Sequence, residues 1–512
     1  MRVLLAVDAG TTGVRALAVD ALGGVVDVAY RDLTQCYPEP GWVEHDAADI
    51  LSLVDDTLRE LAARLEAARH EVVALGITNQ RETTVAIDRS DGRALAPAIV
   101  WQDRRTAPQC AMLVESGDAT TIRARTGLAA DPYFSATKMQ WLLEHAPLDG
   151  ARELGLCTID TLVAWHLTGG ADGGRYVTDA SNAARTMLYD LDAAAWCPVL
   201  CSLFSIPTGA LATIVPSCGA IGAVAASIDP WLAGVPVAGI LGDQQAALFG
   251  QRCTSPGMVK ATFGTGAFLL ANAGTARPES GDGLLTTVAW DLGEHGPRSF
   301  ALEASAFVAG AAIQWLRDDL GLIATAAEVA ALAESVTDAN GATFVPALAG
   351  LGSPWWDPSA RGALMGLSRG VTSAHVARAV VESLGFLGRA MLDAMRSGDV
   401  ELTELRVDGG AAAMDLLCQL LANGTGLVVR RPLSVEATAI GAAMIAGMAT
   451  GELDLAGLEA TWAPDASFEP HEDVVGDAAY ATWLDAVSRT RALGDRSSSG
   501  PSISNVAIEG AP

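Results

Sequence analysis

The stretch VLLAVDAGTTGVRALAVD, residues 3–20, decides the fold of this chain. Two apolar runs, 3–7 and 14–20, flank a turn of small residues, and a third apolar run follows at 25–30. Apolar runs that are separated by glycine-rich turns predict antiparallel strands joined as hairpins. We therefore expect the chain to open with a meander of three strands.

The segment after this meander predicts a helix and one more strand. Asp46 is placed to cap a helix, and one face of that helix carries apolar residues at helical spacing: Ile50, Val54, Leu58, Leu61 and Leu65. The apolar run 72–77 then predicts a strand. Three strands, a helix and a strand predict an α/β lobe built on a mixed sheet.

The same pattern returns after residue 250. A second meander is expected from the runs 258–263, 267–272 and 284–290, around another turn of glycine and threonine. Helices are expected at roughly 303–319, 373–396 and 413–423, with short strands near 405 and 427. Two lobes that open with the same kind of hairpin predict a duplicated architecture.

These patterns divide the chain into three parts. We expect an N-terminal lobe over 1–249, a C-terminal lobe over 250–492, and a tail over 493–512. The tail is rich in Ser, Gly and Pro, which predicts disorder. The predicted fold class is α/β, with two lobes that each contain a mixed sheet flanked by helices, and with a cleft between the lobes.

Composition excludes several classes of function. The chain has 60 Asp and Glu against 33 Lys and Arg, for a formal charge of −27, and its lysines are Lys138 and Lys260. So acidic a surface repels phosphate backbones, which argues against nucleic-acid binding. The uncharged stretch 193–228 is broken by Pro and Gly, so we expect no membrane insertion.

The eight cysteines and the N-terminus point to a reducing compartment. No CxxC pair occurs and no cysteine clusters with histidines, which predicts free thiols and argues against a zinc site. The first residues lack the apolar run and cleavage site of a signal peptide, so a cytoplasmic location is expected.

The turn DAGTTGVR, which begins at Asp8, has the groups that bind phosphate. Gly10 lets the backbone approach a ligand closely, Thr11 and Thr12 supply hydroxyl donors, and Arg15 can neutralise a phosphate. Asp8, at the end of the strand, could hold Mg²⁺ through water. An ordinary glycine turn is the alternative.

Two later turns repeat this character. FGTGAF (263–268) occupies the same place in the second meander, and VDGG (407–410) follows a short strand and precedes a helix. Neither a P-loop nor a Rossmann fingerprint occurs in the chain. Together the three turns predict a phosphate-binding crevice between the lobes.

Two further motifs offer catalytic side chains. In GDQQAALFG (242–250), Asp243 could act as a general base toward a hydroxyl, although a helix-capping role is the alternative. In NQRETT (79–84), Arg81 adjoins Glu82 just past a strand, and an exposed ion pair is the alternative.

From about residue 3 to 470 the chain resembles the FGGY carbohydrate kinase family of the actin-like ATPase superfamily. The motifs that carry the resemblance are PGWVEHD (40–46), GITNQRETT (76–84), IVWQDRRT (99–106), YFSATKMQWLLEH (133–145), GDQQAALFGQ (242–251), FGTGAF (263–268) and MGLSRGVTSAHVARAVVESL (365–384). Two of these, at 133–145 and 365–384, fit the signature patterns of the family. NQRETT, IVWQ and DPYFS are typical of its glycerol-using branch.

The resemblance implies ATP-dependent phosphorylation of glycerol to sn-glycerol 3-phosphate, with Asp243 as the general base. The implied polyol-binding side chains are Arg81, Glu82, Trp101, Tyr133, Asp243, Gln244 and Phe268. Trp101 and Phe268 would form an apolar slot for the carbon chain, and the polar groups would hydrogen-bond the hydroxyls. Such a site rejects analogues because its own polar groups would be left unpaired.

The resemblance also implies a site for Mg²⁺ and ATP. The implied ATP-binding residues are Thr11, Thr12, Arg15, Thr265, Gly310, Gln314 and Gly410. Asp8 and Asp243 would hold Mg²⁺ through water. Three residues depart from the family pattern: Ala9 replaces Gln, Gly13 replaces Ser and so removes a hydroxyl that could touch phosphate, and Met414 replaces an Asn near the adenine.

Two alternatives of function remain open. The first is a kinase for another polyol or a ketose, and the second is a non-catalytic sugar- or nucleotide-binding regulator. The resemblance implies a homodimer or homotetramer, as is common in the family. The segment 226–236 has no basic residue, so we expect no inhibition by fructose 1,6-bisphosphate.

Overall fold

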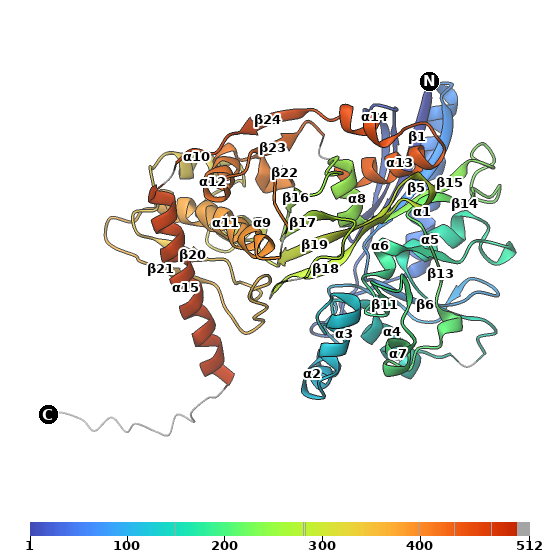
Figure 1. The fold of residues 1–512 in the computed structure, drawn as a ribbon, viewed down its shortest axis with the longest axis horizontal. Coiled ribbons are helices and arrows are strands. Elements are labelled where there is room, and N and C mark those ends of the chain that lie inside the picture. Colours follow the sequence, from blue (N-terminus) through green and yellow to red (C-terminus); the bar gives the residue numbers. More distant parts are fainter. Residues whose placement is uncertain are drawn as a thin grey trace.

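The computed structural model describes residues 1–498 except 149, 280, 282, 399, 435 and 473, and it contains two lobes that are each built on one large mixed sheet (Figure 1). Helix α15 extends to Ser498. The predicted tail lies outside the described residues from 499 onward. Its disorder therefore stays a prediction.

The N-terminal sheet contains the opening meander. Its strand order is β14 (Cys218–Ala223), β15 (Pro236–Gly242), β5 (Glu71–Asn79), β1 (Arg2–Ala9), β2 (Gly13–Val19) and β3 (Val25–Asp32). The three opening strands are antiparallel, and β5 and β15 run parallel to β1. Helix α1 (Ala47–Ala67) begins after Asp46, whose carboxylate accepts a hydrogen bond from the Ala48 N–H at 2.8 Å.

The C-terminal sheet repeats this order and adds one edge strand. The order is β18 (Leu285–Asp291), β19 (Arg298–Ala306), β17 (Ala267–Gly274), β16 (Met258–Phe263), β22 (Glu404–Asp408), β23 (Val429–Pro432) and β24 (Pro464–Phe468). Strands β16, β17 and β19 correspond to β1, β2 and β3, and β22, β23 and β24 correspond to β5, β15 and β14. The predicted duplication is visible in this shared order.

One predicted helix was partly wrong. The expected helix at 303–319 begins only at Gly310 as α9 (Gly310–Asp318), and residues 303–306 belong to strand β19. This strand lies between β17 and β18, which the sequence had suggested as neighbours. Its segment LEASA has weak strand propensity, and pairing on both sides within the sheet overrides that local preference.

The remaining strands form smaller sheets beside the lobes. One contains β4 (Glu44–His45), β8 (Ala98–Ile99), β6 (Thr84–Asp88), β7 (Arg93–Ala94) and β9 (Leu154–Thr158). The paired strands are β10 (Val177–Asp179) with β13 (Thr213–Val215), β11 (Tyr189–Asp190) with β12 (Ala195–Trp196), and β20 (Thr343–Val345) with β21 (Ala363–Met365).

Helices cover the sheets of both lobes. In the first half of the chain these are α2 (Ala107–Glu115), α3 (Asp118–Thr126), α4 (Ser135–His145), α5 (Ile159–Leu167), α6 (Ala180–Ala183), α7 (Pro198–Leu203) and α8 (Asp243–Gly250). In the second half they are α10 (Glu328–Glu334), α11 (Ser373–Arg396), α12 (Asp415–Thr425), α13 (Ala437–Ala449), α14 (Leu455–Ala460) and α15 (Val474–Ser498). Helix α11 matches the expected helix at 373–396.

Helices α8 and α13 lie where the two sheets meet (Figure 1). Both are rich in Ala and Gly, so their backbones come close together: a Cβ placed on Gly441 of α13 would lie 1.9 Å from the carbonyl oxygen of Ala246 in α8. Apolar residues of both lobes form one cluster here, including Leu4 of β1, Trp290 of β18 and Met444 of α13. The lobes are therefore joined by a packed core.

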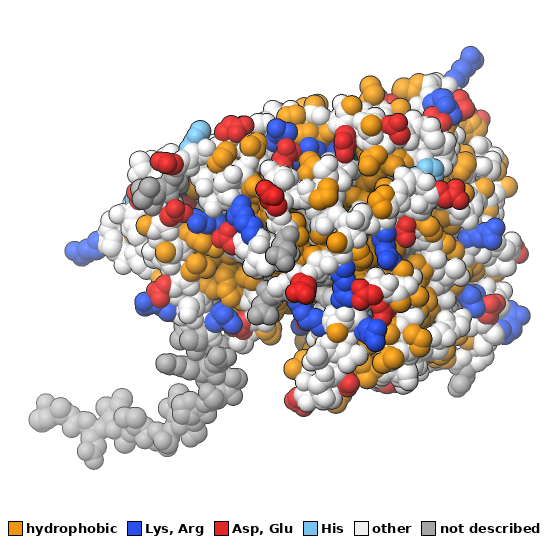
Figure 2. All heavy atoms as spheres, in the orientation of Figure 1, with side chains coloured by type: hydrophobic (Ala, Val, Ile, Leu, Met, Phe, Trp, Pro, Cys, Tyr) orange, Lys and Arg blue, Asp and Glu red, His pale blue; other side chains and the backbone are white. Residues whose placement is uncertain are grey.

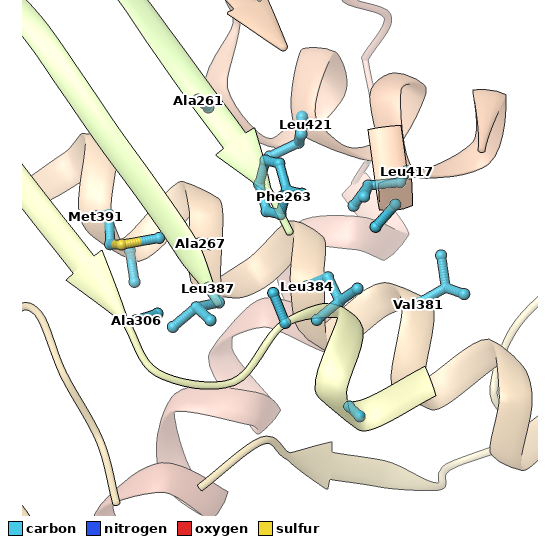
Figure 3. Packing of buried hydrophobic residues seen from close by; sticks show 14 of the residues in the cluster. Ala261, Phe263, Ala267, Ala306, Val381, Leu384, Leu387, Met391, Leu417 and Leu421 are labelled. Atoms are coloured by element: carbon cyan, nitrogen blue, oxygen red, sulfur yellow. The ribbon is translucent and has the colours of Figure 1, made fainter. Parts of the chain in front are cut away.

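The C-terminal lobe has its own core behind the second meander. Phe263, at the end of β16, lies beside Leu421 and Leu417 of α12, with Leu384 and Leu387 of α11 close by (Figure 3). This packing fixes the end of β16 and therefore the turn that follows it.

The surface carries charged side chains of both signs. On the face drawn in Figure 2, acidic and basic side chains are interspersed among apolar ones. Of the eight cysteines, Cys36 is exposed and the other seven are buried free thiols. Among the described residues, no helix combines the length and the apolar character that crossing a membrane requires.

Candidate functional site

The turn between β1 and β2 is fixed by hydrogen bonds to its backbone. The Gly10 N–H donates to the Gly13 carbonyl at 3.0 Å. The side-chain amide of Gln80 donates to the Gly10 carbonyl at 3.1 Å, and that of Gln35 donates to the Thr11 carbonyl at 3.1 Å. The backbone is thus held without using the threonine hydroxyls.

The two threonines of this turn remain able to donate. The indole N–H of Trp101 donates to Oγ1 of Thr11 at 2.9 Å, which leaves the hydroxyl hydrogen of Thr11 for another acceptor. Thr12 is exposed. Both residues can therefore offer hydroxyl donors to a ligand, and their binding to a phosphate stays a prediction.

Arg15 lies beside this turn between two carboxylates. Its Nη1 is 2.5 Å from Oε2 of Glu436, the residue before α13, and 3.8 Å from Oδ2 of Asp8, its partner across the β1–β2 pair. Burial raises the pKa of Asp8 to about 7; Arg15 opposes this shift, and Asp243 and Glu436 add to it. A phosphate that binds Arg15 would therefore compete for the guanidinium with Asp8 of the first lobe and Glu436 of the second lobe.

The predicted pair Arg81 and Glu82 is buried, so the alternative of an exposed ion pair was wrong. Each side chain is only 2% exposed, and Nε of Arg81 is 3.6 Å from Oε1 of Glu82. Arg81 also binds Oδ1 of Asp243 at 3.2 Å and donates to the Tyr133 hydroxyl at 3.0 Å. The structure therefore brings together four of the predicted polyol-binding residues.

Two residues that sequence reasoning missed hold this group in place. Glu303 of β19 accepts two hydrogen bonds from Arg81, at 2.7 and 3.2 Å, and one from Arg185 at 2.8 Å. Arg185 also donates to Glu82 at 2.8 Å. Burial opposes ionisation of Glu303, but Arg185 and Arg81 outweigh it and hold its pKa at about 2. Glu303 therefore links the C-terminal sheet to the polar site of the N-terminal lobe.

A signal for Glu303 was present in the sequence. Its segment SFALEASA contains a single charged residue within an otherwise small and apolar run. A strand assignment would have placed that charge on a buried face. Because this segment was predicted to be a helix, the buried charge of Glu303 was not recognised.

Asp243 is the first residue of α8, directly after β15. Its Oδ1 accepts a hydrogen bond from the Gln244 N–H at 2.7 Å, and its side chain is 33% exposed, which leaves it accessible to a substrate. Burial raises the pKa of Asp243 while Arg81 opposes that shift, Glu82 adds to it and Lys260 opposes it. A partly exposed carboxylate with a raised pKa is suited to accept a proton.

Lys260 of β16 joins the second lobe to α8. Its Nζ donates to Oε1 of Gln244 at 2.6 Å and to Oγ1 of Thr262 at 2.9 Å. Burial lowers the pKa of this lysine, and Asp408 and Asp243 partly offset the effect. With its oxygen bound by Lys260, Gln244 can offer its amide N–H groups to a ligand, and its role in binding a polyol stays a prediction.

Tyr133 is held by a buried lysine. Nζ of Lys138 donates to the carbonyls of Pro132, Tyr133 and Phe134 at 2.9, 2.7 and 2.8 Å. Burial raises the pKa of the Tyr133 phenol, so its hydroxyl stays protonated. Because that hydroxyl accepts from Arg81, its hydrogen is left for a ligand. Trp101 packs edge-on against Tyr133, with ring centroids 5.5 Å apart.

Phe268 faces the same region from the second lobe. On β17 it is opposite Ser305, and Leu270 two residues later is opposite Glu303, so Phe268 and Glu303 share one face of the sheet. The apolar slot between Phe268 and Trp101 stays a prediction.

The second Gly/Thr turn is joined to the start of α9. The Gly310 N–H donates to the Gly264 carbonyl at 2.8 Å, and the N–H groups of Ala309 and Ala311 donate to the Thr265 carbonyl at 2.8 and 3.1 Å. The structure thus places Thr265 beside Gly310, while the side chain of Gln314 is exposed one helical turn further along.

The third predicted turn follows β22. Gly409 has φ +89°, and a Cβ there would lie 2.6 Å from the backbone of Phe263, so glycine is needed for this close approach. Gly410 is exposed and has open space on its Cβ side. Met414, where the family usually has Asn, is only 7% exposed and belongs to the core of the second lobe.

Asp8 and Asp243 are the candidate carboxylates for a metal site. Among the described residues, no group of three or more His, Cys, Asp or Glu side chains is arranged to hold a metal ion. Asp8 and Asp243 nevertheless influence each other, since the charge of Asp243 raises the pKa of Asp8. Two carboxylates that interact in this way fit Mg²⁺, which prefers one or two carboxylates together with phosphate oxygens and water.

Comparison with known proteins identifies the family. The N-terminal domain model of the FGGY family of carbohydrate kinases matches residues 3–250, and the C-terminal domain model matches residues 259–450. The chain belongs to the FGGY family of carbohydrate kinases. This FGGY chain is 50% identical over 499 residues to a glycerol kinase of Aromatoleum aromaticum, covering 96% of this chain and 99% of that one. It is 48% identical to a glycerol kinase of Halorhodospira halophila, covering 96% of each chain.

Solved structures agree with the two-lobed fold. A Plasmodium falciparum glycerol kinase with ADP superposes with a TM-score of 0.90 at 30% identity, covering 96% of this FGGY chain and 98% of that one. A xylulose kinase from Brucella ovis superposes with a TM-score of 0.87 at 26% identity, covering 96% of this chain and 100% of that one.

Proposed function

We propose that this chain is a glycerol kinase, which transfers the γ-phosphate of ATP to a terminal hydroxyl of glycerol and forms sn-glycerol 3-phosphate. The observation that carries the proposal is the connected polar group of Arg81, Glu82, Tyr133 and Asp243, in a chain that is 50% identical to a glycerol kinase over nearly its full length. The alternatives are a kinase for another polyol or a ketose, or a non-catalytic binding protein.

The polar group supplies a donor or acceptor for each hydroxyl of a small triol. Arg81 and Glu82 would bind two hydroxyls, and Tyr133 and Gln244 would add donors that are free of other acceptors. The C–H side of glycerol would pack between Trp101 and Phe268. Buried groups that are already oriented by Arg185, Glu303 and Lys138 need little reorganisation when glycerol binds.

Asp243 would act as the general base. It accepts the proton of the terminal hydroxyl while the hydroxyl oxygen bonds to the γ-phosphorus, and the bond from that phosphorus to the bridging oxygen of ADP breaks. Burial raises the pKa of Asp243, which strengthens it as a base, while the charges of Arg81 and Lys260 oppose that shift. A binding protein would have no need of this base.

The nucleotide would lie between the two Gly/Thr turns. Thr11, Thr12 and Arg15 would bind its phosphates from one lobe and Thr265 from the other, and the nucleoside would lie against Gly310, Gln314 and Gly410. Asp8 and Asp243 would hold Mg²⁺, which neutralises phosphate charge when it is bound. Closure of the lobes would exclude water, which would otherwise compete with glycerol as the acceptor.

The test is ADP release by the purified protein with Mg-ATP and different acceptors. We expect a rate with glycerol that greatly exceeds the rates with dihydroxyacetone, erythritol, xylulose or no acceptor. Selectivity for another acceptor would retain the kinase and contradict the glycerol assignment. No turnover with any acceptor, alongside measurable nucleotide binding, would favour the binding protein. Fructose 1,6-bisphosphate should not inhibit, because segment 226–236 has no basic residue.

A further inference from the structure

The space above Gly13 is filled by the phenol of Tyr30. A Cβ placed on Gly13 would lie 2.3 Å from the Tyr30 hydroxyl oxygen and 2.5 Å from two carbons of its ring. Such distances are far below van der Waals contact, so no side chain larger than hydrogen fits at residue 13 while Tyr30 keeps this position. The Tyr30 hydroxyl therefore occupies the space that a serine side chain at residue 13 would need.

Strand register places Tyr30 in line with the phosphate-side residues. Asp8 of β1 is opposite Arg15 of β2, and Arg15 is opposite Tyr30 of β3. Paired residues on neighbouring strands project from the same face of a sheet. Since Arg15 contacts Glu436, which precedes α13, that shared face is the one turned toward the second lobe.

The phenol is accessible and positioned to donate. Its hydroxyl lies 3.4 Å from the carbonyl of Thr12 and donates to Asp32 at 3.0 Å, and the guanidinium carbon of Arg15 is 5.7 Å from the ring centroid. Tyr30 is 42% exposed, so a ligand at the turn can reach it. Burial and the hydrogen bond to Asp32 raise its pKa, which keeps the phenol protonated.

We propose that the Tyr30 hydroxyl is a phosphate-binding donor of this chain, which contacts the nucleotide held at the Thr11–Thr12 turn beside Arg15. A phosphate oxygen replaces Asp32 as the acceptor of its hydrogen bond. The proposal rests on the proposed use of ATP, and it adds a residue outside the turn to the phosphate site. Gly13 and Tyr30 are then one functional unit, because the glycine makes room for the phenol.

The first test compares Tyr30→Phe with the unsubstituted protein. The variant keeps the ring and removes the donor, so we expect KM for ATP and Kd for ADP to rise about tenfold, as for loss of a hydrogen bond to a charged group. KM for glycerol and Kd for adenosine should not change, because neither ligand carries a phosphate. Tyr480→Phe is the matched control: its phenol lies in the second lobe beside Asp393, and its loss should leave all four constants unchanged.

The second test moves the hydroxyl back to residue 13. Gly13→Ser alone should weaken ADP binding, because the new side chain displaces the Tyr30 ring. Adding Tyr30→Val to Gly13→Ser makes room for the serine and should restore Kd for ADP to within about threefold of the original. Thermal unfolding of each variant shows whether it is folded.

The outcomes separate this proposal from the proposed function. Unchanged ADP binding in a folded Tyr30→Phe variant would overturn the role of Tyr30, whatever the enzyme's substrate. Equal weakening for ADP and adenosine would also overturn it, since the effect would not then depend on phosphate. If the unsubstituted protein binds ADP but does not phosphorylate glycerol, the proposed function fails, and the ADP measurements still decide the role of Tyr30.

Discussion

The two Gly/Thr turns occupy the same place in duplicated sheets, yet their surroundings differ. The turn after β1 is flanked by side chains that carry charge or hydroxyls, namely Asp8, Arg15 and Tyr30. The turn after β16 is instead bonded through its backbone to the first residues of α9. The shared fold therefore sets where each turn lies, and the neighbouring side chains decide what each can do.

This contrast suggests that the two turns have different roles in the reaction. We expect the N-terminal turn and α8 to supply charge, proton transfer and polyol binding, and the C-terminal turn to supply a rigid backbone surface for the nucleotide. Glu303 is an exception to this separation, because it comes from the second sheet and orients Arg81 in the first lobe. Substitutions on the two sides should therefore change different kinetic constants.

The largest effect is expected for Asp243→Asn. The variant keeps the size of the side chain and removes the base, so kcat should fall by about a thousandfold. Glycerol binding, measured by calorimetry, should remain detectable. A variant that kept a substantial fraction of kcat would contradict the assignment of Asp243 as the base.

Glu303→Gln should weaken the candidate polyol site from the second lobe. The substitution leaves Arg81 and Arg185 without their shared carboxylate, so we expect KM for glycerol to rise and the free energy of unfolding to fall by about 3 kcal/mol. Steady-state kinetics and urea denaturation measure the two effects. Asp318→Asn removes an exposed carboxylate of the same lobe and is the control. Unchanged KM for glycerol in the folded Glu303 variant would show that Arg81 is oriented without it.

Gly310→Ala should weaken the binding of the nucleotide and leave the binding of glycerol unchanged. Its Cβ would lie 2.6 Å from the Gly264 carbonyl, so the second turn must shift, and we expect KM for ATP to rise roughly tenfold. KM for glycerol should stay the same. Gly209→Ala, where a Cβ has open space, is the control. A rise in KM for glycerol equal to that for ATP would contradict the division between the two turns.

The last effect concerns the pH dependence of stability through Asp8. Because its pKa is raised to about 7, the folded protein retains this proton up to neutral pH, whereas the unfolded chain releases it near pH 4. Ionising Asp8 therefore destabilises the folded protein progressively as the pH rises from about 4 to 7.

Asp8→Asn removes the free-energy cost of ionising this carboxyl group in the folded protein. Without nucleotide, the variant should be more stable than the original by about 2 kcal/mol at pH 8, and the gain should be smaller at pH 5. Thermal unfolding at the two pH values measures it. Asp20→Asn, which changes an exposed turn near the same sheet, is the control. An equal gain at both pH values would mean that the proton of Asp8 is not responsible.

Local patterns were enough to predict much of the fold. Apolar runs predicted β1, β2 and β5, because most residues of these strands are buried on both faces of the sheet. Helical spacing after Asp46 predicted α1, because the buried residues of this helix fall on the face that its sequence marks. Candidate site residues such as Thr11, in the first turn, and Asp243, at the start of α8, stand next to strand ends and were predicted from the motifs that contain them.

Only the tertiary structure decided which distant residues share a site. Glu303 meets Arg81 because β19 lies between β17 and β18, and the sequence of β19 does not state its partners. Tyr30 reaches the phosphate turn because strand register sets it opposite Arg15. The sequence by itself determined the two lobes and their turns, since these depend on local alternation and glycine. Sheet order and register depend on packing between segments far apart in the chain, so they settled the charge network around Arg81 and the pairing of Gly13 with Tyr30.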